Sequence, residues 1–208
     1  MNLEDLHATN PYLNFPIGLY PTPEIIGWHS NSPMFERLVM EVRPRLIIEV
    51  GTWLGASAIT MARAAEKHGL DCNILCIDTW LGALDHFQTD YLRLRRENGY
   101  PSVYKQFMAN VIHEGLQRRI IPFPQTSIIA ARWLTSRNVA ADMVYIDASH
   151  DYEDVLADIE SYAKLVRPGG VLFGDDIGID GVRLALHEWC QKNDKLVEVY
   201  AEKWVMRM

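Results

Sequence analysis

Segments with strand character alternate with segments of helical spacing along most of the chain, and this alternation limits the folds it can adopt. Short runs rich in Ile, Val and Leu are the expected strands, at 45–50, 73–78, 119–124, 142–147 and 169–176. The expected helices follow them, at 56–69, 104–116, 127–136, 152–166 and 181–193. Strands that alternate with helices predict a parallel sheet covered on both faces, the doubly wound α/β class.

The remaining segments predict how the sheet begins and ends. Residues 195–200 and 203–208 have the pattern of a closing antiparallel hairpin. Residues 1–33 are rich in proline, which favours extended structure, and are expected to form an N-terminal extension across a single domain of residues 1–208. Residues 80–103 interrupt the alternation, and a connection of this length is typical of a lid or substrate-binding segment.

Composition narrows the class of partner. The net charge of -7 argues against a nucleic-acid surface, which needs a basic face, and favours a small-molecule ligand. No long apolar run suggests a leader or a membrane span, so we expect a cytoplasmic protein without membrane contact. The odd number of cysteines, without paired spacing, indicates ordinary buried thiols. Oligomeric state stays open, although the N-terminal arm could cover a neighbouring subunit in a homo-oligomer.

The first strand-to-helix turn carries the pattern E-x-G-x-x-x-G, formed by Glu49, Gly51 and Gly55. Glycines at such a turn let a ligand approach the backbone and leave free amides at the helix N-terminus. This is not the dinucleotide pattern G-x-G-x-x-G, and an acid at this point can accept from the ammonium group of an amino acid. Asp78, at the end of the second strand, can accept from both hydroxyls of a ribose. Ribose and amino acid together describe S-adenosylmethionine, although tight turns and a helix cap would leave the same residues.

With these residues in place, the chain resembles the class I S-adenosylmethionine-dependent methyltransferases, and more narrowly the group near the catechol and caffeoyl-CoA type O-methyltransferases. The most specific part of the resemblance is "YIDASHDYEDV…DIESYAKLVRPGGVLFGDD". It implies a Rossmann-like sheet of seven strands in the order 3-2-1-4-5-7-6, with an antiparallel last strand. By position it also implies a cofactor site, whose residues are Glu49, Gly51, Thr52, Gly55, Ser57, Asp78, Thr79, Thr126, Ser127 and Asp147. Ser57 is equally explained as a first-turn helix residue.

Three aspartates predict a metal site. Asp147 ends the fourth strand, and Asp175 and Asp176 end the fifth. Because adjacent strands lie about 4.8 Å apart, these carboxylates should converge and repel one another unless a cation lies between them. Mg²⁺ or Ca²⁺ suits such a site, and in the catechol-type relatives the matching positions hold Mg²⁺. The alternative is that Asp147 faces the cofactor and the Asp175–Asp176 pair caps a turn without metal.

His150 is the candidate catalytic base, with Asp147 as the other catalytic residue. The resemblance implies a lysine base in a D-x-x-K motif, where this chain has D-A-S-H. A histidine with an ordinary pKa of about 6.5 is mostly neutral at pH 7 and can accept a hydroxyl proton. A histidine hydrogen-bonded near a helix start explains the residue equally well. Ser149 and Asp151 are explained as helix caps as readily as site residues.

The predicted function is methyl transfer from S-adenosylmethionine to a hydroxyl group of a sugar, phenol or natural product. The alternatives are a catalytically inactive cofactor-binding or scaffold protein and a nicotinamide-dependent oxidoreductase. The candidate substrate contacts are His86, Asp85 and the aromatic residues Trp53, Trp80, Tyr91 and Tyr104, although packing explains the aromatic residues equally well. The arginines 93, 95 and 96 could steer an acidic substrate, and a solvated helix face is the simpler interpretation.

Overall fold

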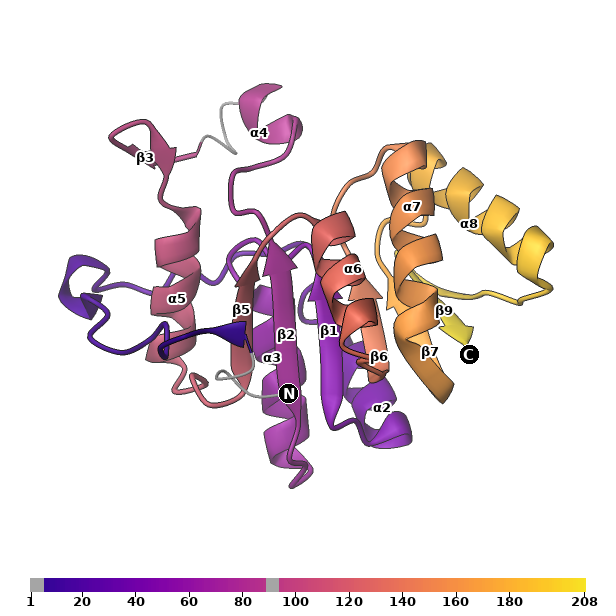
Figure 1. The fold of residues 1–208 in the computed structure, drawn as a ribbon, viewed down its shortest axis with the longest axis horizontal. Helices are drawn as coiled ribbons and strands as arrows, with labels where there is room; N and C mark the ends of the chain where they lie inside the picture. Colours follow the sequence, from indigo (N-terminus) through magenta and orange to yellow (C-terminus); the bar gives the residue numbers. More distant parts are fainter. Residues whose placement is uncertain (1–5, 89–93) are drawn as a thin grey trace.

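The computed structural model describes residues 6–88 and 94–208 and places a seven-stranded sheet at the centre (Figure 1). The sheet order is β5-β2-β1-β6-β7-β9-β8. The first five strands in this order are parallel, whereas β9 pairs antiparallel with β7 and with β8. The strands are β1 (Leu46–Val50), β2 (Asn73–Asp78), β5 (Ile120–Pro124), β6 (Ala141–Ile146), β7 (Val166–Gly174), β8 (Glu198–Tyr200) and β9 (Lys203–Arg207). Numbered within this sheet, the order is 3-2-1-4-5-7-6, so the predicted topology is confirmed.

Helices cover both faces of the sheet because alternate strand residues point to opposite sides. One face packs on α2 (Pro33–Val42), α3 (Ala56–Lys67) and α5 (Val103–His113). The other packs on α6 (Ser127–Ser136), α7 (Tyr152–Tyr162) and α8 (Asp180–Asn193). In Figure 1, α6 and α7 lie in front of the sheet and α2 and α3 behind it. The central strand β1 is buried along its whole length, as a strand between two helical layers must be.

The predicted helix at 152–166 is shorter than expected. It ends at Tyr162, a 3-10 turn follows at Ala163–Leu165, and Val166 already begins β7. Val166 pairs with Ala141 of β6 in the sheet, so it must already be extended. The chain therefore leaves the helix early, although Val166 continues its apolar spacing.

The long connection after β2 contains structure that the alternation did not predict. A short helix, α4 (Asp85–Gln88), is followed by a small antiparallel pair, β3 (Arg96–Glu97) and β4 (Tyr100–Pro101). Figure 1 shows α4 and β3 at the end of the molecule toward which β2 points, where ligands bind in open α/β sheets. Tyr91 and Arg93 lie outside the described residues. A role for residues 80–103 as a lid therefore stays a prediction.

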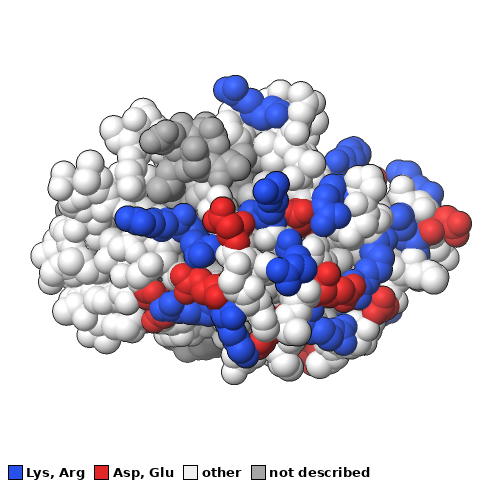
Figure 2. Space-filling view, turned by 90° about the horizontal axis from the view of Figure 1, so that it is seen from below, with Lys and Arg blue, Asp and Glu red and all other residues white. Residues whose placement is uncertain are grey.

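The opposite end of the molecule carries intermixed charges. Figure 2, which views the molecule from below, shows Lys and Arg interspersed with Asp and Glu. Elsewhere in the described chain, Arg63 pairs with Glu66 and Glu114, and Arg119 pairs with Glu66. No helix among the described residues is long and apolar enough to span a membrane. Cys72, Cys76 and Cys190 are buried and free of disulfides.

Candidate functional site

The site is built at the carboxyl ends of the parallel strands, where the loops after β1, β2, β6 and β7 meet. The loop after β1 comes closest to the loop after β6 at Gly51. The φ of this glycine is +84°, and a Cβ at this position would lie 2.0 Å from the backbone oxygen of Asp147. Glycine is therefore required here, because any side chain would separate the loop after β1 from the end of β6.

Glu49 lies fully buried beneath that loop. Thr52 Oγ1 donates to its carboxyl group at 2.9 Å, the Ser57 hydroxyl donates to the other oxygen, and the Cys76 thiol lies at 3.5 Å. Burial raises the pKa of Glu49 to about 8, and the charge of Asp147 acts in the same direction. The structure thus joins three residues predicted for the methionine part of the cofactor, Glu49, Thr52 and Ser57, into one hydrogen-bonded cluster.

Asp78 holds the glycine turn from the neighbouring strand. Its Oδ2 accepts from the backbone amides of Thr52, at 3.0 Å, and Trp53, at 2.9 Å, and its Oδ1 accepts from Trp80 at 2.7 Å. The acid predicted for the ribose therefore lies beside the turn, as expected, and it also fixes the turn's shape. Thr79 Oγ1 accepts from the amide of Leu81 at 3.2 Å and stabilises the next bend.

Thr126 and Ser127 lie at the N-terminus of α6, beyond the end of β5. Thr126 is the N-cap, and its hydroxyl accepts from the amide of Ile129 at 3.4 Å. The Ser127 side chain hydrogen-bonds the carboxyl group of Asp158, whose pKa burial raises to about 6. Ser127 therefore belongs to the contact between α6 and α7, which only the tertiary structure reveals.

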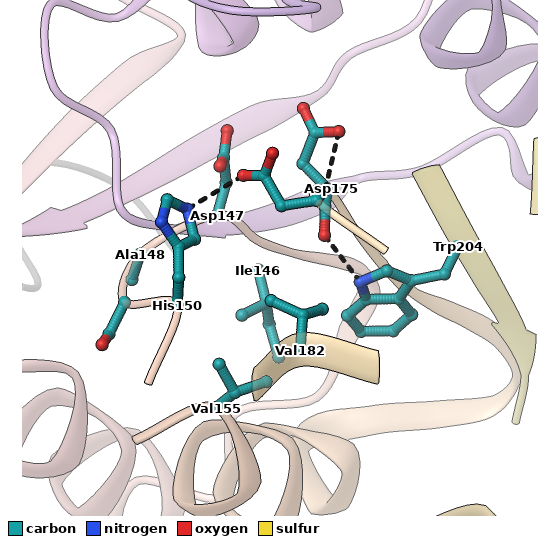
Figure 3. Close-up of a pocket in the computed structure, with 10 residues that line it drawn as sticks. Ile146, Asp147, Ala148, His150, Val155, Asp175, Val182 and Trp204 are labelled. Atoms are coloured by element: carbon teal, nitrogen blue, oxygen red, sulfur yellow. Dashed lines mark hydrogen bonds and ion pairs between the residues drawn. The ribbon is translucent and has the colours of Figure 1, made fainter. Parts of the chain in front are cut away.

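The three predicted aspartates line one pocket, together with Ser149, His150 and apolar residues of β6, α7 and α8. In Figure 3 the carboxyl groups of Asp147 and Asp175 point to the same side, away from Val155 and Val182. Burial, together with the negative charges of Asp175 and Asp176, raises the pKa of Asp147 to about 7. The repulsion expected from the sequence is present at Asp147.

His150 is joined to Asp176. Its Nε2 lies 2.9 Å from Asp176 Oδ2, and this contact lowers the pKa of Asp176. A carboxylate bonded to one ring nitrogen orients the imidazole and stabilises its protonated form, as the third member of a catalytic triad does. Asp151, in contrast, precedes α7 at the N-cap position, although its side chain makes no capping bond.

Asp175 has a partner that the sequence did not indicate. Lys203, at the start of β9, is 1% exposed, and its Nζ donates to Asp175 Oδ2 at 2.6 Å and to the Tyr145 hydroxyl at 2.9 Å. The Tyr145 hydroxyl in turn donates to Asp147 Oδ2 at 3.0 Å. The register explains the position of Lys203: Trp204 pairs with Gly174, so the preceding residue lies opposite Asp175.

The N-terminal arm also reaches the aspartates. His29 Nδ1 lies 3.5 Å from Asp175 Oδ2. Among the described residues, two groups could hold a metal ion by the proximity of their ligand atoms: His29 with Asp175 and Asp176, and Asp147 with His150 and Asp176. Proline content predicted an arm across the domain, but no signal in the sequence identified His29 as the residue at the site.

Residues of the long connection pack against each other and the core. Trp80 is buried, donates from Nε1 to the backbone oxygen of Trp53 at 2.8 Å, and contacts the ring of Tyr104. Packing therefore accounts for Trp80. The ring of His86 lies 4.1 Å from that of Trp53. Of the arginines, Arg95 pairs with Glu24 at 2.8 Å, and Arg96 lies over the ring of Phe87. The Asp85 side chain is outside the described part of the chain.

Comparisons with known proteins agree with this geometry. A family model described as a methyltransferase domain matches residues 48–177. Over 156 residues, 74% of this chain and 55% of the relative, the chain is 27% identical to the rhamnosyl O-methyltransferase of Mycobacterium tuberculosis. It is 25% identical over 175 residues to protein y4gI of Sinorhizobium fredii, covering 83% of this chain and 17% of that protein. The chain thus spans about half, or less, of the length of these relatives.

Among solved structures, the O-methyltransferase TomG of Streptomyces achromogenes, determined with S-adenosylmethionine, superposes with a TM-score of 0.61 at 17% identity. The match covers 99% of this chain and 97% of TomG. At this identity the likeness establishes the fold.

Proposed function

We propose that this chain, which belongs to the methyltransferase domain family, transfers the methyl group of S-adenosylmethionine to a hydroxyl group of a small molecule. The predicted family is confirmed, since its model matches residues 48–177, more than half of the chain. The observation that carries the proposed activity is the convergence of the Gly51 turn, Asp78 and the aspartate cluster at one edge of the sheet. Cofactor and acceptor would meet there, and positioning two reactants supplies much of the rate of such a transfer.

We further propose a role for each predicted cofactor residue. Asp78 would accept from the ribose hydroxyls, and Glu49 with Thr52 and Ser57 would receive the methionine part. Thr79 follows the end of β2, and Thr126 and Ser127 lie beyond the end of β5, where the adenine would fit. The relative from Mycobacterium tuberculosis, a rhamnosyl O-methyltransferase, supports a sugar as the acceptor class.

A divalent cation is proposed at Asp147 and Asp176. These carboxylates fit Mg²⁺, which commonly binds proteins through one or two carboxylates and keeps several waters. Asp175 fits less well because its Oδ2 accepts from Lys203 and its Oδ1 accepts from the amide of Asp176 at 3.0 Å. When bound, such an ion orients substrate oxygens and lowers the pKa of the hydroxyl to be methylated. His150, held by Asp176, would accept the hydroxyl proton.

Titration calorimetry tests the cofactor first. S-adenosylmethionine and its demethylated product, S-adenosylhomocysteine, should bind metal-stripped protein with micromolar affinity. Asp78→Ala should abolish that binding. Asp71→Ala, which removes an exposed acid just before the amino end of β2, is the matched control and should bind normally. Failure of both cofactor forms to bind wild-type protein would refute the proposed activity, and heat from NADH instead would favour an oxidoreductase.

The acceptor and the ion are tested next. The protein is incubated with S-adenosylmethionine and a panel of rhamnosides, other sugars and phenols, with Mg²⁺, with Ca²⁺ and with a chelator. Mass spectrometry should detect an added methyl group on a hydroxyl of one class. Equal rates with the chelator and with Mg²⁺ would remove the cation from the proposal while leaving the methyl transfer intact.

A further inference from the structure

Lys203 is a fully buried lysine whose surroundings all suit a cation. Its Nζ lies 4.8 Å from the centre of the Phe35 ring and 5.0 Å from that of Tyr145, and it contacts Asp175 at 2.6 Å. Aromatic faces attract an ammonium group, and a buried charge is costly unless it is paired and hydrogen-bonded. The surroundings of the Lys203 ammonium therefore suit a positive charge, and it lies against Asp175 of the aspartate cluster.

The hydrogen bonds of Tyr145 extend the influence of this cation to Asp147. The Tyr145 hydroxyl accepts from Lys203 and has one proton to donate. Asp147 Oδ2 lies at 3.0 Å and Asp175 Oδ2 at 3.3 Å. Asp147 Oδ2 is the nearer acceptor and Asp175 Oδ2 already accepts from Lys203 at 2.6 Å, so we assign the proton to Asp147.

The charges of the cluster can then be counted. The three carboxylates carry three negative charges when ionised, and Lys203 contributes one positive charge directly on Asp175. With His150 beside Asp176 unprotonated, and with Asp147 and Asp176 both ionised, two negative charges remain, and these match one divalent cation. Without Lys203, Asp175 would be a third carboxylate open to the ion, as the sequence alone predicted.

We propose that the Lys203 ammonium is an internal cation of this site, which holds Asp175 as its counter-ion and leaves Asp147 and Asp176 as the carboxylates that receive a divalent cation. This inference deepens the proposed function and rests on it for the location of the cation. Lys203 acts through Asp175 and Tyr145 and is a positioning residue.

The test is a titration with Mn²⁺ alone, in which electron paramagnetic resonance reports the free ion and no acceptor is needed. Lys203→Met should bind Mn²⁺ at least about tenfold more tightly than wild type, because a nearby positive charge is removed and Asp175 is released. Asp175→Asn added to Lys203→Met should restore affinity to near the wild-type value. Arg207→Met, which removes a cation from the same strand at exposed ion pairs, is the control and should leave the affinity unchanged.

Each outcome decides the proposal. Equal affinity of wild type and Lys203→Met, including no binding by either, overturns it, as does tight binding retained in the double variant. A gain in affinity cannot arise from damaged folding. If Lys203→Met alone does not fold, the double variant, which buries no unpaired charge, is compared with Asp176→Asn. The double variant should keep wild-type affinity and Asp176→Asn should lose at least about tenfold, whereas an equal loss in both overturns the proposal. Binding of S-adenosylhomocysteine, measured in parallel, reports separately on the proposed function.

Discussion

The closest backbone approach in the site, at Gly51, gives a prediction whose magnitude follows from two separate physical terms. Gly51→Ala places a methyl group at a positive φ, which costs an L-residue about 1–2 kcal/mol. The same methyl would lie 2.0 Å from the backbone oxygen of Asp147, where no flexible side chain can move aside. Overpacking of this kind costs about 1–3 kcal/mol. The expected loss in the free energy of unfolding is therefore about 2–5 kcal/mol.

Gly69→Ala is the matched control, because Gly69 also has a positive φ, of +63°, but nothing lies within 4 Å of its added Cβ. It should lose only the backbone term, about 1–2 kcal/mol. Urea unfolding of both variants and wild type measures the difference. Gly51→Ala should also weaken S-adenosylhomocysteine binding, whereas Gly69→Ala should not. Equal destabilisation by the two substitutions would refute the claim that Gly51 is required by contact with Asp147.

Three further substitutions test other parts of the site. The pKa of Glu49 is raised from its ordinary value of 4.5 to about 8, so between these values the folded protein binds a proton that the unfolded chain releases, and stability should fall as pH rises. Relative to Glu49→Gln, wild type should lose up to about 1.4 kcal/mol of unfolding free energy per pH unit, measured by urea unfolding at pH 5, 6, 7 and 8. Parallel pH profiles of the two proteins would contradict this. His150→Ala should reduce methyl transfer by more than about tenfold without changing cofactor affinity, whereas His187→Ala, on the exposed face of α8, should change neither; retained turnover would remove His150 from the mechanism. Trp80→Phe removes the hydrogen bond to the backbone oxygen of Trp53 and should cost about 1–3 kcal/mol in thermal unfolding, and an unchanged melting temperature would show that the bond contributes little.

Much of the candidate site could be predicted because its residues lie at strand ends. The periodicity of a buried strand is local, so the ends of β1, β2, β6 and β7 were visible in the sequence. Parallel strands place their carboxyl ends at one edge of the sheet, so Glu49, Asp78 and Asp147 were expected together there, and the structure brings them together. Their roles toward a cofactor stay proposals.

The partners of these residues could not be predicted in the same way. Ser127 was expected near the adenine, and this stays a prediction; its hydrogen bond to Asp158 could not be expected, because the packing of α6 on α7 brings the two side chains together. His29 reaches Asp175 from an arm whose path depends on the finished surface of the domain. Such contacts join segments far apart in the chain, and residue spacing carries no record of them.

The sequence by itself determined the order of strands and helices along the chain and the cluster of acids at the ends of the strands. Each follows from local residue spacing and from the direction of the strands. Only the tertiary structure decided how the charge of that cluster is balanced. Lys203 looks in the sequence like an ordinary lysine before a closing strand, and the antiparallel register of β9 on β7 places it opposite Asp175. Pairing between distant strands is set by the packing of the whole sheet, and for that reason the internal cation of the site became visible only in the folded molecule.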